Sequence, residues 1–199
     1  MNPQVGRIAP NRHARLTTAV AIVLLLGLLA FLGLSHRQHS AAQGRPQSTL
    51  KLMSSSFAAG GAIPQRFTCD GAGISPALGW APGPHGTASF ALVMHDPDAP
   101  VDFTHWLIYN IPPGVHSLAE GASSRGAMPL GSAEGINGFR HLGYGGPCPP
   151  PGRPHHYVFQ LYALDRRLDL PPGAARNTLD AAIEGHVLAQ GQLIGDYGR

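Results

Sequence analysis

The chain has 199 residues, a formal net charge of +3 and eleven histidines, and only 13% of its residues are charged. The positive charge is weak and dispersed, with no run of Lys or Arg, so a nucleic-acid-binding protein is not expected. The 26 glycines and 19 prolines predict many turns and loops rather than long helices. A chain of this length fits one folded domain with a short additional segment.

The N-terminal region has the pattern of a membrane signal. Residues 16–34 carry no charge and are almost entirely apolar, and residues 1–15 before them contain Arg7, Arg12 and Arg15. A run of roughly 20 apolar residues can span a bilayer as a helix, and preceding basic residues favour a cytoplasmic N-terminus. We therefore expect a transmembrane anchor at 16–34 that places the following domain outside the cytoplasm.

A cleaved signal peptide is the alternative for the same segment. The apolar run is longer than the roughly 7–15 residues usual in a signal peptide. However, Ser40, Ala41 and Ala42 are small enough for cleavage near Ala42, which would release a secreted or periplasmic protein. In either case residues 35–49 are expected to form a flexible linker and residues 50–199 the domain.

Short strands and turn-rich loops dominate the expected domain. The expected elements are, in chain order, a strand at 65–69, a turn at 69–73, a buried strand at 88–94, a strand at 105–110 and a long loop at 114–138. The clearest strand is 156–164, where Tyr157, Phe159 and Leu161 alternate onto one face. This pattern predicts a mostly β protein of sandwich type.

One helix is expected near the C-terminus. Leu179, Ile183 and Val187 have the i, i+4, i+8 spacing of one helix face. Asn177 is a candidate N-cap, and Asp180 would place a negative charge in the first turn, where it is favoured.

Two loops stiffened by proline are candidates for a functional site. The first, residues 96–100, reads Asp-Pro-Asp-Ala-Pro and is followed by His105. The second, residues 143–152, is followed by His155 and Tyr157. Because proline fixes φ, such loops lose little entropy when they organise a pocket, and rigid loops on a β scaffold commonly carry function.

The chemistry of these loops suits an anion. His105, His155 and Tyr157 offer donors, and the consecutive amides of Gly145 and Gly146 could form an anion-binding concavity. A carboxylate of the first loop could accept from an imidazole and fix its tautomer. If imidazoles hold the anion, affinity should rise as the pH falls through about 6.5. The alternative is that these aspartates and histidines have a purely structural role, since Asp is common in turns and a single His at a strand end is seldom a ligand.

Metal binding and catalysis are weaker interpretations. No H-x-x-x-H or H-E-x-x-H pattern for zinc occurs, and there is no G-x-S-x-G nucleophile elbow. Cys148 lies in the second loop, where a nearby His could lower its pKa, so a thiol enzyme is an alternative. Cys69 and Cys148 are not a C-x-x-C pair and are either two separate thiols or one disulfide. We expect no enzymatic activity, no metal and no cofactor.

The loop motifs resemble the two signatures of the phosphatidylethanolamine-binding protein family, also called Raf-kinase-inhibitor-like proteins, in its bacterial branch. The similar segments are residues 96–100 with His105 and Trp106, residues 143–150 with His155 and Tyr157, residues 67–71, Ser75 with Pro76, and the tail 184–199. The resemblance runs in order from about residue 50 to the C-terminus.

The resemblance implies a large antiparallel sheet packed on a smaller one, with few helices, and a pocket for phosphate-like groups or phospholipid head groups. Carried over residue by residue, the pocket is lined by Asp96, Asp98, Pro100, His105, Gly146, Pro149, His155 and Tyr157. It also suggests that Cys69 and Cys148 lie close together and can form a disulfide. Some family members are described as inhibitors of kinases or proteases, so a protein-interaction module is the alternative function, although no partner surface is visible in the sequence.

Overall fold

The computed structural model describes residues 48–123 and 125–199, so the predicted N-terminal segments 1–15 and 16–34 and most of the predicted linker lie outside the described residues. Within the described part, no helix is long and apolar enough to cross a membrane. The elements are β1 (Ser48–Thr49), β2 (Leu52–Met53), β3 (Gly61–Ala62), the 3-10 helix η1 (Gln65–Phe67), β4 (Leu78–Trp80), β5 (Ser89–Asp96), β6 (Phe103–Ile111), β7 (Ser117–Leu118), β8 (Ala133–Glu134), β9 (His155–Leu164), α2 (Arg176–Ile183) and β10 (Val187–Tyr197).

Seven strands form a large sheet whose long strands are antiparallel. Neighbouring strands follow the order β1-β10-β9-β5-β6-β8, and β3 also pairs with β10. β10 with β9, β9 with β5, β5 with β6 and β6 with β8 are antiparallel pairs. β1 and β3, with two residues each, run parallel to β10. The antiparallel prediction is therefore right for the long strands and wrong for these two short ones.

Two glycines of β10 explain how the short parallel strands fit against it. A Cβ on Gly191 would clash with the carbonyl of Leu50, and a Cβ on Gly195 would lie 2.6 Å from the Phe57 ring. The segments that contain Leu50 and Phe57 therefore approach β10 at positions where it has no side chain. The Leu50 N–H donates to the Gln190 carbonyl at 2.7 Å. Because glycine is uncommon inside strands, the sequence pattern did not predict β10.

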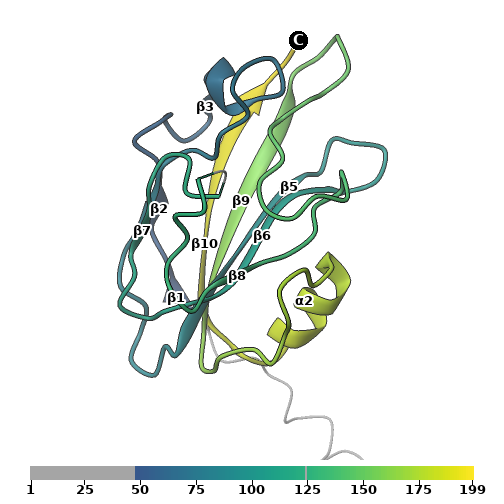
Figure 1. Cartoon of the computed structure of the whole chain (residues 1–199). Coiled ribbons are helices and arrows are strands. Elements are labelled where there is room, and N and C mark those ends of the chain that lie inside the picture. Colours follow the sequence, from purple (N-terminus) through teal and green to yellow (C-terminus); the bar gives the residue numbers. More distant parts are fainter. Residues whose placement is uncertain (1–47, 124) are drawn as a thin grey trace, which may run out of the picture. The chain divides into compact units, whose positions relative to one another are not determined.

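A smaller sheet covers one face of the large sheet, and α2 covers the other (Figure 1). The small sheet has the order β2-β4-β7. The core between the sheets includes Leu52, Leu78, Trp80, Phe90, Leu92, Trp106 and Phe159. The core under α2 includes Ala91, Val93, Leu107, Tyr109, Leu179 and Ile183. Successive residues of β5 and β6 enter opposite cores, so these strands are buried on both faces and read as apolar runs.

The strongest strand predictions are confirmed. The strands predicted at 88–94, 105–110 and 156–164 are β5, β6 and β9. On β9, Tyr157, Phe159 and Leu161 are fully buried, as the predicted alternation requires. The loop predicted at 114–138 is largely a loop, interrupted by the short strands β7 and β8.

The predicted strand at 65–69 is wrong, because this segment begins with η1. The N–H groups of Phe67 and Thr68 donate to the carbonyls of Pro64 and Gln65, both at 2.9 Å. The Thr68 hydroxyl also donates to the Gln65 carbonyl at 2.8 Å. These bonds span three residues and close a tight local turn that competes with strand pairing.

The helix is found, but its predicted ends are wrong. α2 begins at Arg176 with Ala175 at the N-cap position and no capping side chain, so Asn177 lies inside the helix. Asp180 lies outside the first turn and accepts a hydrogen bond from Arg176 Nε at 2.8 Å. The helix ends before Gly185, whose φ of +79° suits glycine, and Val187 begins β10 instead of extending the helix face.

Candidate ligand-binding site

A cavity of about 340 Å³ lies at the end of the large sheet where β5 ends and β6 and β9 begin. Seven of the eight predicted pocket residues line it, namely Asp96, Asp98, Pro100, His105, Pro149, His155 and Tyr157. The sequence interpretation missed five other lining residues, which are Ala99, Phe103, Phe139, Cys148 and Pro150. The cavity therefore has a polar set of side chains from three strands and apolar walls from Phe and Pro.

Asp96 organises the first loop from the end of β5. One carboxylate oxygen accepts the backbone N–H groups of Asp98 at 2.9 Å and Ala99 at 3.2 Å, which closes an Asx turn. The other oxygen lies 2.7 Å from Nδ1 of His155 on β9. These bonds use three acceptor positions of the buried carboxylate and hold the loop and His155 in place.

Asp98 makes a second link between the first loop and the segment before β9. Its Oδ2 accepts the backbone N–H of His156 at 2.8 Å and its ring Nδ1 at 2.6 Å, and its Oδ1 lies 3.3 Å from Arg153. These bonds lower the pKa of Asp98 and raise the pKa of His156. His156 therefore supports the pocket without lining it.

The second loop docks on His105 through a pair of hydrogen bonds. The Gly145 N–H donates to the His105 carbonyl at 2.8 Å, and Nδ1 of His105 lies 2.8 Å from the Gly145 carbonyl. Because the Gly145 N–H already donates to the His105 carbonyl, it cannot contribute to the predicted anion-binding concavity of two glycine amides. Gly146 is the predicted residue that does not line the cavity. A Cβ there would lie 2.7 Å from the Phe67 carbonyl, so glycine permits a close backbone approach.

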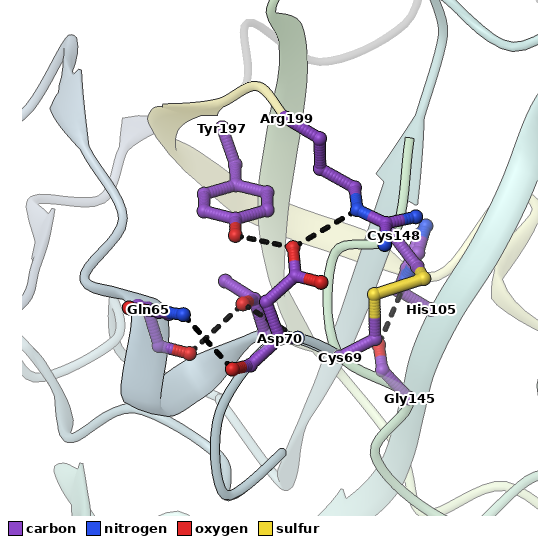
Figure 2. The surroundings of a disulfide bond; sticks show 9 residues. Gln65, Cys69, Asp70, His105, Gly145, Cys148, Tyr197 and Arg199 are labelled. Atoms are coloured by element: carbon purple, nitrogen blue, oxygen red, sulfur yellow. Dashed lines mark hydrogen bonds and ion pairs between the residues drawn. A yellow bond between two sulfur atoms is a disulfide. The ribbon is translucent and has the colours of Figure 1, made fainter. Parts of the chain in front are cut away.

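A disulfide between Cys69 and Cys148 fastens the second loop to the turn after η1, with a Cα–Cα distance of 5.4 Å (Figure 2). The Cys69 N–H also donates to the Pro147 carbonyl at 3.1 Å. Asp70 anchors the turn, because its carboxylate accepts the Tyr197 hydroxyl at 2.6 Å and Arg199 Nε at 3.0 Å. Cys148 is therefore bonded and presents no free thiol to the cavity in this structure.

His105 is a buried imidazole in an aromatic setting. It is 2% exposed, and its ring contacts those of Phe103, Phe139 and Tyr157 at centroid distances of 5.1, 5.6 and 5.1 Å. Burial lowers the pKa of His105, and the Gly145 carbonyl and the Asp96 charge oppose this only in part. The predicted rise in anion affinity through pH 6.5 must therefore begin at lower pH if it depends on His105.

Tyr157 carries the one hydroxyl in the lining of the cavity, and this hydroxyl is buried with no well-formed hydrogen bond among the described residues, although the Asp96 carboxylate and the Cys148 backbone lie near enough to interact with it. Burial and the nearby Asp96 carboxylate raise the pKa of Tyr157, so the group stays protonated. Buried polar groups in native proteins are nearly always paired, and an unpaired one costs about 1–3 kcal/mol. The hydroxyl is therefore placed to donate a stronger hydrogen bond to a ligand that enters the cavity.

No arrangement of three or more His, Cys, Asp or Glu side chains that could hold a metal ion is present within residues 48–123 and 125–199. Both carboxylates at the cavity are paired with an imidazole, Asp96 with His155 and Asp98 with His156. The side-chain groups best placed for an occupant are Tyr157 Oη and the second ring nitrogens of His105 and His155.

Comparisons with known proteins agree with this architecture. The family profile described as phosphatidylethanolamine-binding protein matches residues 53–198. A UPF0098 protein of Methanothermobacter thermautotrophicus is 49% identical over 75% of this chain and 99% of its own length. LppC of Mycobacterium tuberculosis, named as a candidate lipoprotein, is 40% identical over 74% of this chain and 72% of its own length.

Two solved structures share the fold. YbcL of Escherichia coli, described as a new member of the mammalian family of phosphatidylethanolamine-binding proteins, has a TM-score of 0.72 and 30% identity over 76% of this chain and 99% of its own. The homologue CT736 of Chlamydia trachomatis has a TM-score of 0.69 and 35% identity over 77% of this chain and 99% of its own. The profile, the relatives and the shared fold together show that the chain belongs to the phosphatidylethanolamine-binding protein family.

Proposed function

We propose that the domain binds, without catalysis, a small ligand with an anionic group, either a phosphate-like group or a phospholipid head group. The observation that carries the proposal is the buried hydroxyl of Tyr157, which lines the cavity without a well-formed hydrogen bond of its own. A phosphate oxygen is a strong acceptor that would pair this hydroxyl, and His155 can add a donor when its ring is protonated. The name of the family supports a ligand of this class.

The two carboxylates at the cavity do not oppose an anion as strongly as the sequence suggests. Asp96 is paired with His155, and Asp98 is paired with His156 and Arg153. These hydrogen bonds and the positive charge of Arg153 beside Asp98 partly offset the negative charge that a ligand meets. Phe103, Phe139 and the prolines of the wall would contact the apolar part of the ligand.

The proposal includes that the domain does not catalyse a reaction of the ligand. The cavity lining contains no Ser, Thr, Lys or free Cys, and its Asp96, His105 and His155 side chains are held by hydrogen bonds within the protein, which favours a binding role. The side chains that remain can orient and neutralise a ligand.

Isothermal titration of the full-length protein with phosphoethanolamine tests the binding proposal. Tyr157→Phe should weaken binding about tenfold, because a hydrogen bond to a charged group is worth about 1.5–3 kcal/mol. Tyr162→Phe is the matched control, since Tyr162 lies on the same strand and packs against the core on the opposite face of the sheet. Equal affinities of the wild type and Tyr157→Phe would remove the cavity as the binding site.

We also propose that the domain lies outside the cytoplasm, anchored by residues 16–34 or released by cleavage near Ala42. The disulfide supports this location, because structural disulfides persist in oxidising compartments. The relative LppC, named as a candidate lipoprotein, adds support. A reporter that functions only outside the cytoplasm, fused after Arg199, should be active, whereas activity of a strictly cytoplasmic reporter would contradict the proposed location.

A further inference from the structure

We propose that the cavity binds phosphate monoesters more tightly than phosphate diesters, and that a hydrogen bond to His105 is the source of this selectivity. This inference rests on the proposed function and narrows it. A phosphate monoester has an acidic oxygen that can carry a proton, whereas a diester has none. The two classes therefore differ in the hydrogen bond that they can offer to an acceptor.

The hydrogen bonds of His105 make its second ring nitrogen an acceptor. Nδ1 lies 2.8 Å from the carbonyl oxygen of Gly145, which can only accept, so Nδ1 carries the proton of the neutral ring. The Gly145 N–H donates back to the His105 carbonyl at 2.8 Å, which fixes the position of the loop relative to the ring. No well-formed hydrogen bond uses Nε2 within the described residues, although the Gly146 backbone also lies close to the ring, and His105 lines the cavity. Neutral His105 thus presents a lone pair to a ligand.

The surroundings of His105 favour the neutral ring. It is 2% exposed, and burial lowers its pKa. The titratable groups around it are Asp96 and His95 from β5, Asp98 from the first loop, and His155 and Tyr157 from β9. Asp96 favours the charged ring and His95 opposes it, but both aspartates already have cationic or donor partners. At neutral pH the ring is therefore an acceptor.

A monoester and a diester meet this acceptor differently. The second pKa of a phosphate monoester is about 6, so near that pH a monoester supplies one P–O–H group for Nε2 of His105. Its unprotonated oxygens then accept from the Tyr157 hydroxyl. A diester presents only lone pairs, so Nε2 can bond to it only after His105 takes a proton from solvent. In the complex one proton lies between Nε2 of His105 and a phosphate oxygen, and it is bonded to one of these two atoms.

Calorimetric titration of the full-length protein with methyl phosphate and dimethyl phosphate tests the inference. At about pH 6, methyl phosphate should bind at least about tenfold more tightly, the size of one hydrogen bond involving a charged group. At about pH 7.5, where the free monoester is mostly a dianion, binding of methyl phosphate should take up about one proton per site. Buffers with different ionisation enthalpies measure that uptake.

His105→Asn isolates the role of Nε2. The asparagine amide can still donate to the Gly145 carbonyl but has no counterpart of Nε2, so methyl phosphate should bind only about as tightly as dimethyl phosphate. His85→Asn is the control, because His85 is exposed and outside the cavity lining, and it should keep the wild-type ratio. A wild-type ratio in His105→Asn would overturn the inference.

Other outcomes separate this inference from the proposed function. If both esters bind the wild type equally and both weaken in Tyr157→Phe, the cavity binds phosphate and the role of His105 is wrong. If neither ester binds, the proposed function fails as well. Nitrogen NMR of the wild-type imidazoles gives a test without any variant. The ligand-free protein at about pH 7 should show an unprotonated Nε2 for His105, and a protonated Nε2 would contradict the inference.

Discussion

The two loops that form the cavity are fastened by different chemistry. The first loop, which the structure extends to residue 102 between β5 and β6, is held to the start of β9 by carboxylate pairs with His155, His156 and Arg153. The second loop, residues 143–152, is held by a disulfide and by backbone hydrogen bonds that do not titrate. The first attachment should therefore respond to pH and the second to reduction.

This difference means that each wall of the cavity can be loosened without directly changing the other. The disulfide closes a long stretch of chain, because the two cysteines are 79 positions apart. The ion pairs join side chains that range from buried Asp96 to exposed His156. Perturbing the attachments one at a time should produce a graded series of effects on stability.

Loss of the disulfide should have the largest effect. In the chain-entropy model a bridge closing a loop of this length stabilises by about 4 kcal/mol, so the double variant Cys69→Ser, Cys148→Ser should lose about that much free energy of unfolding. Urea unfolding followed by fluorescence of the buried Trp80 and Trp106 measures the loss. A dithiol reductant should lower the urea midpoint of the wild type and leave that of the double variant unchanged. Wild-type and variant midpoints that coincide without reductant would show that the bridge does not stabilise the domain.

Asp96→Ala should have the next largest effect, about 3 kcal/mol. It leaves the N–H groups of Asp98 and Ala99 and Nδ1 of His155 without their acceptor in a buried setting. Asp102→Ala is the control in the same loop, because the Asp102 side chain is 49% exposed and its pair with His95 should contribute less than about 1 kcal/mol. Equal losses in the two variants, measured by urea unfolding, would contradict the role of Asp96 as the organiser of the loop.

The pair of Asp98 and His156 should produce the smallest effect and a pH dependence. The pKa of Asp98 is lowered from 3.8, so its contribution is present above pH 3.8 and is lost as the pH falls through the lower folded-state pKa. The pKa of His156 is raised from 6.5, so its contribution is present below pH 6.5 and is lost as the pH rises through the higher folded-state pKa. Both contributions are complete only between these two values.

His156→Ala should therefore reduce stability at about pH 5.5 and have less effect at about pH 8.5. The loss should be below about 1 kcal/mol, because the His156 side chain is 55% exposed and solvent screens the pair. His141→Ala, at another exposed histidine, is the control. An effect of His156→Ala that is the same at both pH values would show that the charged pair is not the source of the stability.

Local patterns in the sequence predicted the strands that carry the site. The alternation around Tyr157 placed β9 correctly, and the apolar run of β5 predicted a strand buried on both faces. β10 was missed because Gly191 and Gly195 are needed only for contacts with distant segments of the chain. Such contacts leave no periodic signal in the strand itself.

The same limit applies to the candidate site. The paired loops and their histidines were visible in the sequence, and the structure brings them together around one cavity. The sequence could not show that the Gly145 amide is occupied by the His105 carbonyl, or that His156 pairs with Asp98, because both depend on how the loops dock. Phe139 was missed because its loop has no motif that ties it to the cavity.

NMR of the side chains and backbone during addition of inorganic phosphate tests most directly whether this cavity is the binding site. The largest shift changes should fall on Tyr157, His105 and His155, which line the cavity from β9 and β6. These changes should require more phosphate in Tyr157→Phe, because that variant lacks the Tyr157 hydroxyl. Changes confined to exposed arginines such as Arg140, with none at Tyr157 or His105, would show that phosphate binds elsewhere and would contradict the proposed site.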